Sequence, residues 1–151
     1  MLKGQIAIRR ATADDASAVH DIVLRAIRET NARDYPASVI DRLAMTQPQT
    51  VSSNLATWLA FVAIVDGRIV GTAGLSVYSV QSVFVHPAYQ RMGVGTKLMD
   101  AVEKAAVAQF VRTLDVQSSV TAQPFYAMRG FRIVREGFYD EERWIIMTKA
   151  L

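Results

Sequence analysis

The feature that most constrains this chain is the loop Gln-Arg-Met-Gly-Val-Gly at residues 90–95, which separates two stretches of different periodicity. Residues 82–85 contain β-branched and aromatic side chains and predict a short strand that ends before Pro87. After Gly95, apolar residues recur at the spacing of one helical face as far as Ala108. The loop therefore lies where a strand leads into the N-terminus of a helix.

A helix N-terminus of this kind attracts anions, because its first backbone N–H groups have no partner and the helix dipole is positive there. Gly93 and Gly95 have no Cβ, so a ligand can approach the backbone closely. Two glycines at the start of a helix are also common in plain turns. A dinucleotide-binding loop of the Rossmann type is the main competing interpretation, but Leu98 stands where its third glycine is required.

The loop resembles the acetyl-CoA-binding loop of the GCN5-related N-acetyltransferase (GNAT) superfamily, whose pattern is Gln/Arg-x-x-Gly-x-Gly/Ala. This resemblance implies that the strand, the loop and the following helix bind acetyl-CoA as a cosubstrate. The cofactor-binding residues that it implies are Val83, Val85, Gln90, Arg91, Met92, Gly93, Val94, Gly95, Thr96, Thr121 and Arg129.

A second segment, residues 121–131, is similar to the family pattern Asn-x-x-Pro/Ala-x-x-Phe-Tyr-x-x-x-Gly-Phe when one residue of tolerance is allowed. The resemblance implies that Tyr126 is the general acid beside the thioester sulfur. Thr121 replaces the family's asparagine, which hydrogen-bonds the pantetheine arm, although threonine can still cap a helix and donate one hydrogen bond. The alternative for Tyr126 is a core aromatic whose hydroxyl is satisfied.

The general base is an open question in this sequence. Family members often carry a glutamate on the strand equivalent to residues 79–85, and this stretch contains no carboxylate. Glu29 is our candidate base, acting through water, and Asp34 is an alternative; both also fit a solvated helix end. His86 precedes a proline and is interpreted as a turn residue. The backbone N–H near Val85 is expected to stabilise the oxyanion.

The order of expected elements predicts an α/β (α+β) fold with a mixed, mainly antiparallel sheet of about six or seven strands and about four helices on both faces. The GNAT resemblance implies the same acyl-CoA N-acyltransferase fold. Expected strands span residues 5–10, 58–65, 68–77, 82–85, 111–117, 131–135 and 143–149; expected helices span 12–30, 36–45, 95–110 and 119–129; the connections include 47–54 and 136–142.

Length and composition fit one soluble domain over residues 1–151, with 51% apolar residues and a net charge of +3. The chain has no cysteine, and His20 and His86 form no ligand motif, so no metal site is expected. Basic residues form no long run, so nucleic acid is not an expected partner. No membrane span or signal segment is evident, which favours a cytoplasmic protein; a homodimer remains possible.

These observations lead to two hypotheses about function. The first is an acetyl-CoA-dependent N-acetyltransferase that transfers an acetyl group to a primary amine of a small molecule or peptide by direct attack in a ternary complex. The second is a catalytically silent acyl-CoA-binding or sensing module, suggested by the missing strand glutamate and by Thr121. The sequence does not identify the amine.

Overall fold

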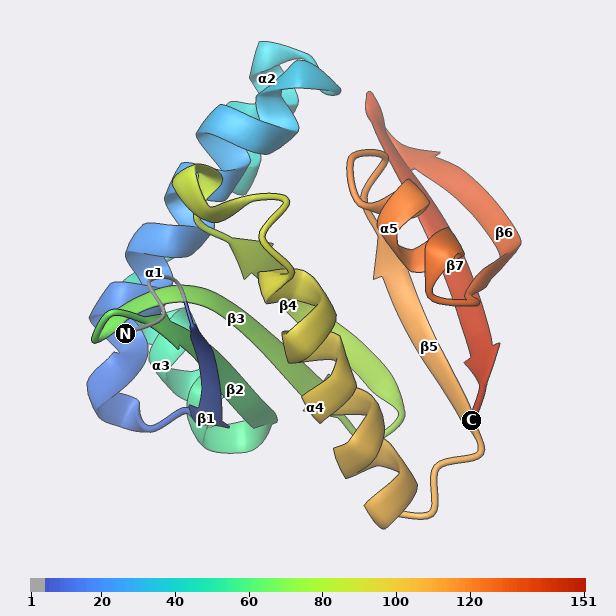
Figure 1. Cartoon of the computed structure of the whole chain (residues 1–151). Helices are drawn as coiled ribbons and strands as arrows, with labels where there is room; N and C mark the ends of the chain where they lie inside the picture. The colour runs from blue at the N-terminus through green and yellow to red at the C-terminus, as the bar shows by residue number, and fades with distance from the viewer. Residues whose placement is uncertain (1–4) are drawn as a thin grey trace.

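The computed structural model of the chain describes residues 5–151, in which one seven-stranded sheet has the order β1-β2-β3-β4-β5-β7-β6 (Figure 1). All neighbouring strands are antiparallel except β4 and β5, which confirms the expected mixed sheet. The strands are β1 (Ile6–Arg10), β2 (Leu59–Val65), β3 (Arg68–Ser76), β4 (Ser79–Val85), β5 (Thr113–Ser118), β6 (Arg132–Tyr139) and β7 (Glu142–Ala150).

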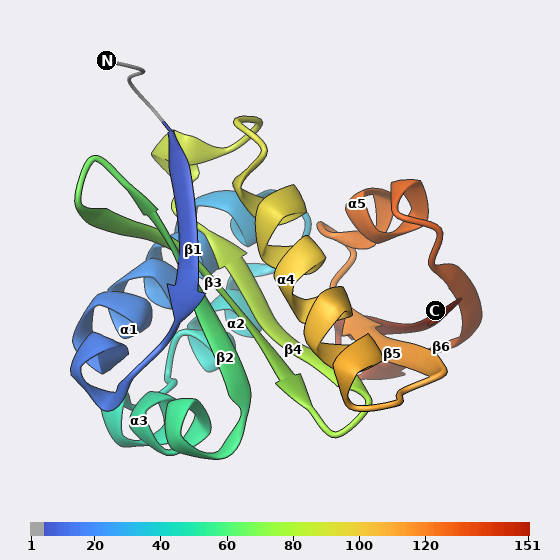
Figure 2. The ribbon, with the colours of Figure 1, turned by 60° about the horizontal axis from the view of Figure 1, so that its bottom comes forward.

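Helices cover both faces of the β1–β4 part of the sheet, as expected. Figure 2 shows α1 and α3 on one side of these strands and α4 on the other. The α-helices are α1 (Ala16–Arg25), α2 (Ala37–Leu43), α3 (Pro48–Thr57), α4 (Val94–Ala108) and α5 (Gln123–Met128). The first helix does not end at Arg25 but continues as a π-helical turn, Ala26–Thr30, and a 3₁₀ turn, Asn31–Arg33.

The hydrophobic core is divided by the sheet into two clusters. One lies under α4 and includes Leu98 and Val102, and the other lies under α1 and α3 and includes Val23 and Leu55. On β2, Val62 belongs to the second cluster and its neighbour Ala63 to the first, because successive strand residues point to opposite faces. β2 is therefore buried on both sides, which explains why its sequence is apolar without alternation.

The prediction of a polar loop at residues 47–54 is wrong, because α3 occupies this stretch and brings the number of α-helices in residues 5–151 to five. Pro48 stands in the first turn, where its missing N–H costs nothing. Val51 and Leu55, one helical turn apart, are both buried. Polar residues on the remaining faces obscured this short apolar stripe.

The predicted connection at residues 136–142 is also wrong, since β6 runs to Tyr139 and only Asp140 and Glu141 remain between the strands. Most of β6 is exposed, and an exposed edge strand shows no clear apolar alternation. The predicted starts of two other elements also differ from the structure. β4 begins at Ser79, before the predicted strand, and α5 begins at Gln123, after the predicted start of its helix.

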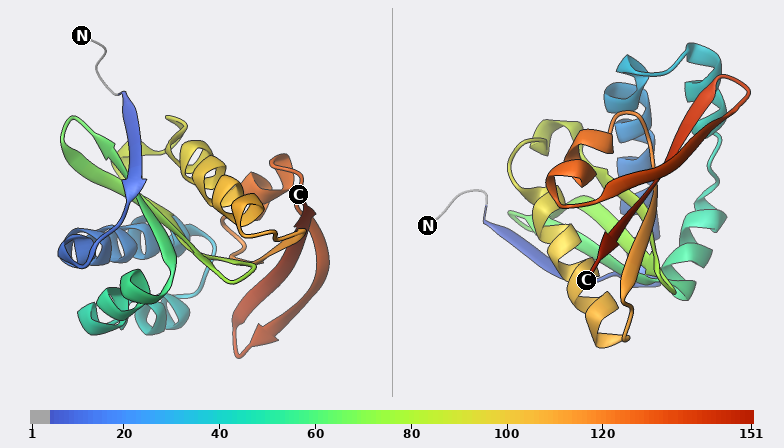
Figure 3. Two further views of the ribbon diagram at one scale, coloured as in Figure 1. Left: turned by 90° about the horizontal axis from the view of Figure 1, so that it is seen from below. Right: turned by 90° about the vertical axis from the view of Figure 1, so that its right-hand side faces the viewer.

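The strands β4 and β5 separate soon after they meet, and this separation positions the functional site. They pair in parallel only at Ser79–Asp115 and Val80–Val116. Beyond these pairs, the register of β4 against β3 shifts and Ser82 has a positive φ of 49°, as in a β-bulge. The two strands then diverge, with α4 and α5 beside the divergence (Figures 1 and 3).

Candidate active site

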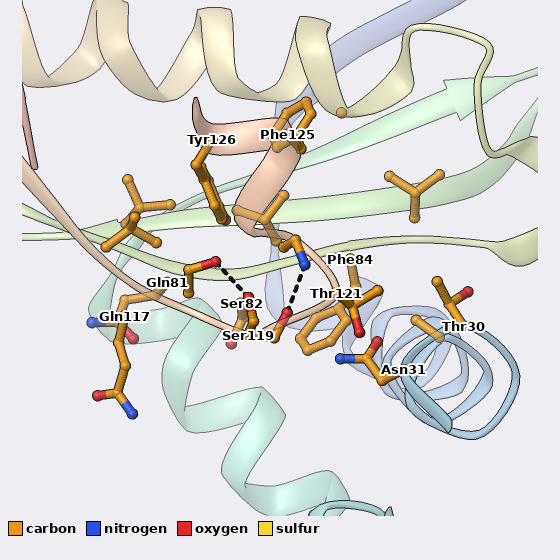
Figure 4. Close-up of a pocket in the computed structure, with 18 of the residues that line it drawn as sticks. Thr30, Asn31, Gln81, Ser82, Phe84, Gln117, Ser119, Thr121, Phe125 and Tyr126 are labelled. Atoms are coloured by element: carbon orange, nitrogen blue, oxygen red, sulfur yellow. Dashed lines mark hydrogen bonds between the residues drawn. The ribbon is translucent and has the colours of Figure 1, made fainter. Parts of the chain in front are cut away.

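A cavity of about 650 Å³ occupies the divergence of β4 and β5. Figure 4 shows Tyr126 and Phe125 entering from the α5 side, with Thr30 and Asn31 at the far wall. Further walls come from β4, the loop before α4, β5, β7 and Arg135 of β6 (Arg132–Tyr139). Ten of the predicted site residues line the cavity: Val83, Val85, Gln90, Arg91, Gly93, Val94, Gly95, Thr96, Thr121 and Tyr126.

One end of the cavity is the N-terminus of α4. Gly93 is the N-cap residue with φ 85°, a left-handed conformation that glycine adopts without strain, and a Cβ placed there would meet open space. The first helical bond runs from the Lys97 N–H to the Gly93 carbonyl at 3.1 Å. The N–H groups of the first turn precede it, so they have no partner within the helix. This end of the cavity is suited to an anion.

Gly95 is required for a second reason. A Cβ at this position would lie 3.3 Å from the ring of Phe125, so the absence of a side chain lets α5 pack against the first turn of α4. This contact places the helix that carries Tyr126 next to the anion-binding end of the cavity.

The backbone of β4 lines the middle of the cavity. The His86 N–H donates to the Val70 carbonyl of β3 at 2.8 Å, so the preceding residue, Val85, directs its backbone groups away from β3. The Gln90 side chain donates to the Val85 carbonyl at 3.1 Å from that side. The Val85 N–H faces the same way, which is the orientation that the predicted oxyanion donor requires.

Tyr126 is buried and projects from α5 toward the divergence of the strands (Figure 4). Its ring packs edge-on against Phe125 and Phe131, with centroids 5.3 and 5.4 Å away. Its hydroxyl has no hydrogen-bond partner among residues 5–151, and burial raises the pKa of Tyr126 well above its usual value. The hydroxyl therefore keeps its proton and is free to donate a hydrogen bond into the cavity.

Thr121 lines the cavity, but its hydroxyl is already engaged. Its Oγ1 donates to the Asp34 carboxylate at 2.7 Å, which links the segment before α5 to the turns after α1. The neighbouring Ala122 N–H donates to Ser119 Oγ at 3.0 Å. Only the acceptor lone pairs of the Thr121 hydroxyl remain for a ligand.

The structure does not bring Glu29 to the cavity. Its side chain is 55% exposed and lies 4.0 Å from Arg25 on the same helical segment. The carboxylates that do line the cavity are Asp115 and Glu142, and Glu142 forms an ion pair with Arg42 at 2.5 Å. Glu142 belongs to the stretch 136–142 that was predicted as a connection, and in the structure it is the first residue of β7.

Arg129 and Met92 also lie outside the cavity lining. Arg129 donates to Glu103 at 2.7 Å and to Asp100 at 2.9 Å, and Lys149 contacts the other oxygen of Glu103 at 2.6 Å. The structure thus gives Arg129 a place in an ion-pair network between α4, α5 and β7. This network was not visible in the sequence, because its members are far apart along the chain.

Tyr35 holds the far end of the cavity together. Its hydroxyl accepts from the Val120 N–H at 2.7 Å and donates to the Arg143 carbonyl at 3.3 Å. Three segments distant in sequence therefore meet at one phenol. No local pattern in the sequence distinguishes Tyr35 from the other aromatic residues of the chain.

His86 is a buried turn residue, as predicted. Its Nδ1 accepts from the Ala88 N–H at 3.0 Å and so caps the 3₁₀ turn Pro87–Tyr89 that precedes the loop. Burial lowers the pKa of His86. Within residues 5–151, Nε2 of His86 has no hydrogen-bond partner.

The helices of residues 5–151 include none that is long and apolar enough to cross a membrane.

Comparison with known proteins decides the family. The family model described as Acetyltransferase (GNAT) domain matches residues 25–151. The chain belongs to the GNAT acetyltransferase family. The match covers the loop, α4, the strand divergence and Tyr126, so the resemblance expected from the sequence is confirmed.

Relatives of this GNAT chain agree with that assignment. It is 28% identical over 131 residues to the uncharacterized N-acetyltransferase YafP of Escherichia coli K12, covering 87% of this chain and 84% of the relative. A GCN5-related N-acetyltransferase structure from Rhodopseudomonas palustris, also described as a class-II aminotransferase, has a TM-score of 0.93 and 28% identity, covering 100% and 99% of the two chains.

A second structure, PaiA N-acetyltransferase from Thermoplasma acidophilum in complex with coenzyme A, has a TM-score of 0.80 at 16% identity, and the match covers 97% of this chain and 99% of that chain. At this identity the likeness concerns the fold. The expected acyl-CoA N-acyltransferase fold is thus confirmed.

Proposed function

We propose that this protein is an acetyl-CoA-dependent N-acetyltransferase that acts on the primary amine of a small molecule or peptide. One observation carries the proposal: a single cavity joins the free N-terminus of α4 to the unpartnered hydroxyl of Tyr126 through the divergence of β4 and β5. Family membership agrees with it.

The residues of the cavity fit coenzyme A. The first turn of α4, at Gly93–Thr96, suits the pyrophosphate, because open space surrounds Gly93 and the backbone N–H groups there need acceptors. Arg91 lines the same end and supplies a positive charge. The backbone of Val83 and Val85 suits the amides of the pantetheine arm, in the manner of an added strand. When bound, acetyl-CoA supplies an acetyl thioester.

The residues of this chain would then act on acyl transfer as follows. The amine nitrogen forms a bond to the carbonyl carbon while the bond from carbon to sulfur breaks. The Val85 N–H, which is directed away from β3, would donate to the carbonyl oxygen as negative charge develops. The Tyr126 hydroxyl would donate to the sulfur as it becomes a thiolate. The amine loses one proton to solvent, and the thiolate takes one up.

The role of Tyr126 is sharpened by its environment. Because burial raises its pKa, transfer of its proton to a thiolate is less favourable than for an exposed tyrosine. Tyr126 therefore acts by hydrogen-bonding the sulfur, and solvent completes the protonation. The proposed role of Glu29 as the base requires a water relay, because its carboxylate lies outside the cavity lining.

A second candidate function is a silent acyl-CoA-binding module. The pairing of Glu142 with Arg42 favours it, because this cavity carboxylate is not free to accept a proton. Both functions predict that acetyl-CoA raises the melting temperature. Release of free CoA thiol across a panel of amines separates them. Amine-dependent release supports the transferase, whereas a thermal shift with no release from any amine supports the module, and no thermal shift contradicts both.

A further inference from the structure

The far end of the cavity has a floor made by one face of the C-terminal strands. The registers of β5, β7 and β6 place Gln117, Ile146 and Arg135 side by side in one row across these strands. Trp144, two residues before Ile146 on β7, lies on the same face, and all four residues line the cavity. The intervening residue, Ile145, points the other way into the core under α4. This floor therefore lies across the sheet from the anion-binding end of α4.

The floor is apolar at its centre. The indole of Trp144 covers Gly137 of β6, where a Cβ would come within 2.3 Å of the ring atom Cζ2. Glycine at this position leaves room for the ring against the edge strand. Ile146 continues the apolar surface toward β5. A substrate body resting here would meet a fixed aromatic shelf.

The edge of the floor is positively charged. Arg135 takes part in none of the ion pairs formed among residues 5–151. Arg143 also lines the cavity and pairs with Glu136 at 2.7 Å, and the nearby Glu142 is neutralised by Arg42. The guanidinium of Arg135 is thus a cation at the cavity whose natural partner is an anion.

The spacing of the strands allows Arg135 to serve an amine held at the divergence. Neighbouring strands are about 4.8 Å apart, so two strand steps place the Arg135 backbone roughly 10 Å from that of Gln117 on β5. Arg135 lines the same cavity as Gln117, so an anion paired with its guanidinium lies on the cavity side of these strands. The distance from such an anion to the β4–β5 gap is short enough for one small molecule to span.

We propose that the acetylated amine belongs to an apolar α-amino acid, whose carboxylate is bound by Arg135 and whose side chain rests on Trp144. This inference rests on the proposed acetyltransferase function. A guanidinium pairs with a carboxylate through two parallel hydrogen bonds, which fixes the orientation of the substrate as well as its charge. The amino group, on the same carbon as the carboxylate, is then directed toward the gap.

The test compares phenylalanine with phenethylamine, which differ only in the carboxylate. We measure the ratio of their kcat/KM values for CoA release in the wild type and in Arg135→Ala. The ratio should fall about 10-fold to 100-fold in the variant, as expected for loss of a charge-assisted pair. Intrinsic differences in amine reactivity cancel when the two ratios are compared. Arg132→Ala, on the same strand but outside the cavity lining, is the matched control and should leave the ratio unchanged.

Calorimetry gives a readout that does not depend on turnover. Phenylalanine should bind the protein in the presence of CoA, and Arg135→Ala should weaken that binding by a similar factor. Gly137→Ala, which forces the Trp144 ring to move, should weaken the binding of phenylalanine while leaving the affinity for CoA unchanged. Equal ratios in wild type and Arg135→Ala, or phenylalanine binding unaffected by either change, would overturn the proposal. If phenethylamine still released CoA thiol, the acetyltransferase function would stand.

Discussion

The two parts of the sheet on either side of the β4–β5 junction differ in how their faces are covered. In the first part, β2 is buried on both faces, with Val62 and Ala63 each 0% exposed. In the second part, β7 buries Ile145 and Met147 in the core cluster that also contains Leu98, while its other face carries Trp144 and Ile146 at the cavity. Figure 3 shows the C-terminal strands standing apart from the rest of the sheet. The second part therefore has a face that is open to a ligand.

This difference shows how a stable scaffold and an adaptable site coexist in one sheet. The doubly covered part holds α4 and the Gly93 loop in place through the larger core. The second part is joined to it at two residue pairs of β4 and β5, by Arg129 and Lys149 on Glu103, and by the hydrogen bonds of the Tyr35 hydroxyl to Val120 and Arg143. The gap between β4 and β5 is therefore closed at the end where the strands pair and open at the other, so a ligand can enter it without disrupting the core.

Tyr126 and Tyr35 offer the largest expected contrast, because one hydroxyl is unpartnered and the other joins three segments. Tyr126→Phe should lower kcat by ~10²–10⁴-fold, as for loss of a group that acts in the transition state. Its melting temperature and CoA affinity should change little, because no hydrogen bond within residues 5–151 is lost. A stable variant with wild-type turnover would exclude the catalytic role.

Tyr35→Phe is the matched control for this contrast. It removes a hydroxyl with two hydrogen bonds, so the free energy of unfolding should fall by about 1–2 kcal/mol. Chemical denaturation measures this loss. An unchanged stability would show that the two sheet parts are held together elsewhere.

Gly93→Glu tests whether the end of α4 binds phosphate. We expect the Kd for CoA to rise on the order of 10²-fold, because the added carboxylate repels phosphate and fills the space before the first turn. Gly67→Glu is the control, since Gly67 also has a positive φ, 77°, with open space around it, but lies in the β2–β3 turn. Both variants should lose similar stability; equal affinities for CoA would refute the assignment.

Arg129→Ala tests the junction between the sheet parts. It leaves Glu103 with Lys149 alone, so the free energy of unfolding should fall by about 1–3 kcal/mol. Because Arg129 lies outside the cavity lining, affinities for CoA and dephospho-CoA should change by the same factor. A larger loss for CoA than for dephospho-CoA would instead support Arg129 as a cofactor-binding residue, in contact with the 3′-phosphate.

His86 provides the smallest expected effect, a pH dependence of stability in the first sheet part. Because burial lowers its pKa, the folded state favours neutral imidazole. Its contribution is complete above about pH 6.5, the usual histidine pKa, and is lost as pH falls through the lower folded pKa. Protonation would also end the bond that Nδ1 accepts from Ala88. The charged groups that influence this pKa are Arg25, Arg68, Glu29 and Asp21.

Melting temperatures of wild type and His86→Asn between pH 5 and 8 measure this effect. Asparagine keeps an acceptor for the Ala88 N–H but does not titrate, so the variant should lose the part of the slope below about pH 6.5 that belongs to His86. Identical slopes in the two proteins would show that His86 does not contribute to the pH dependence of stability.

Much of the fold was predictable because its signals are local. The strand 82–85, the glycines at 93 and 95 and the apolar stripe of α4 follow one another directly, and each records a constraint on its own backbone. The order of strands and helices follows from such segments. The prediction missed α3 and the full length of β6, where a short stripe or an exposed edge leaves a weak apolar pattern.

The strand, loop and helix that present free N–H groups follow from consecutive residues, because glycine conformations and helical periodicity are local properties of the chain. Which side chains face the cavity depends on how distant segments pack together. This packing pairs Arg129 with Glu103, places Glu29 outside the lining, and sets Trp144 over Gly137. These contacts depend on strand register and on charges distant along the chain, and no local pattern records them.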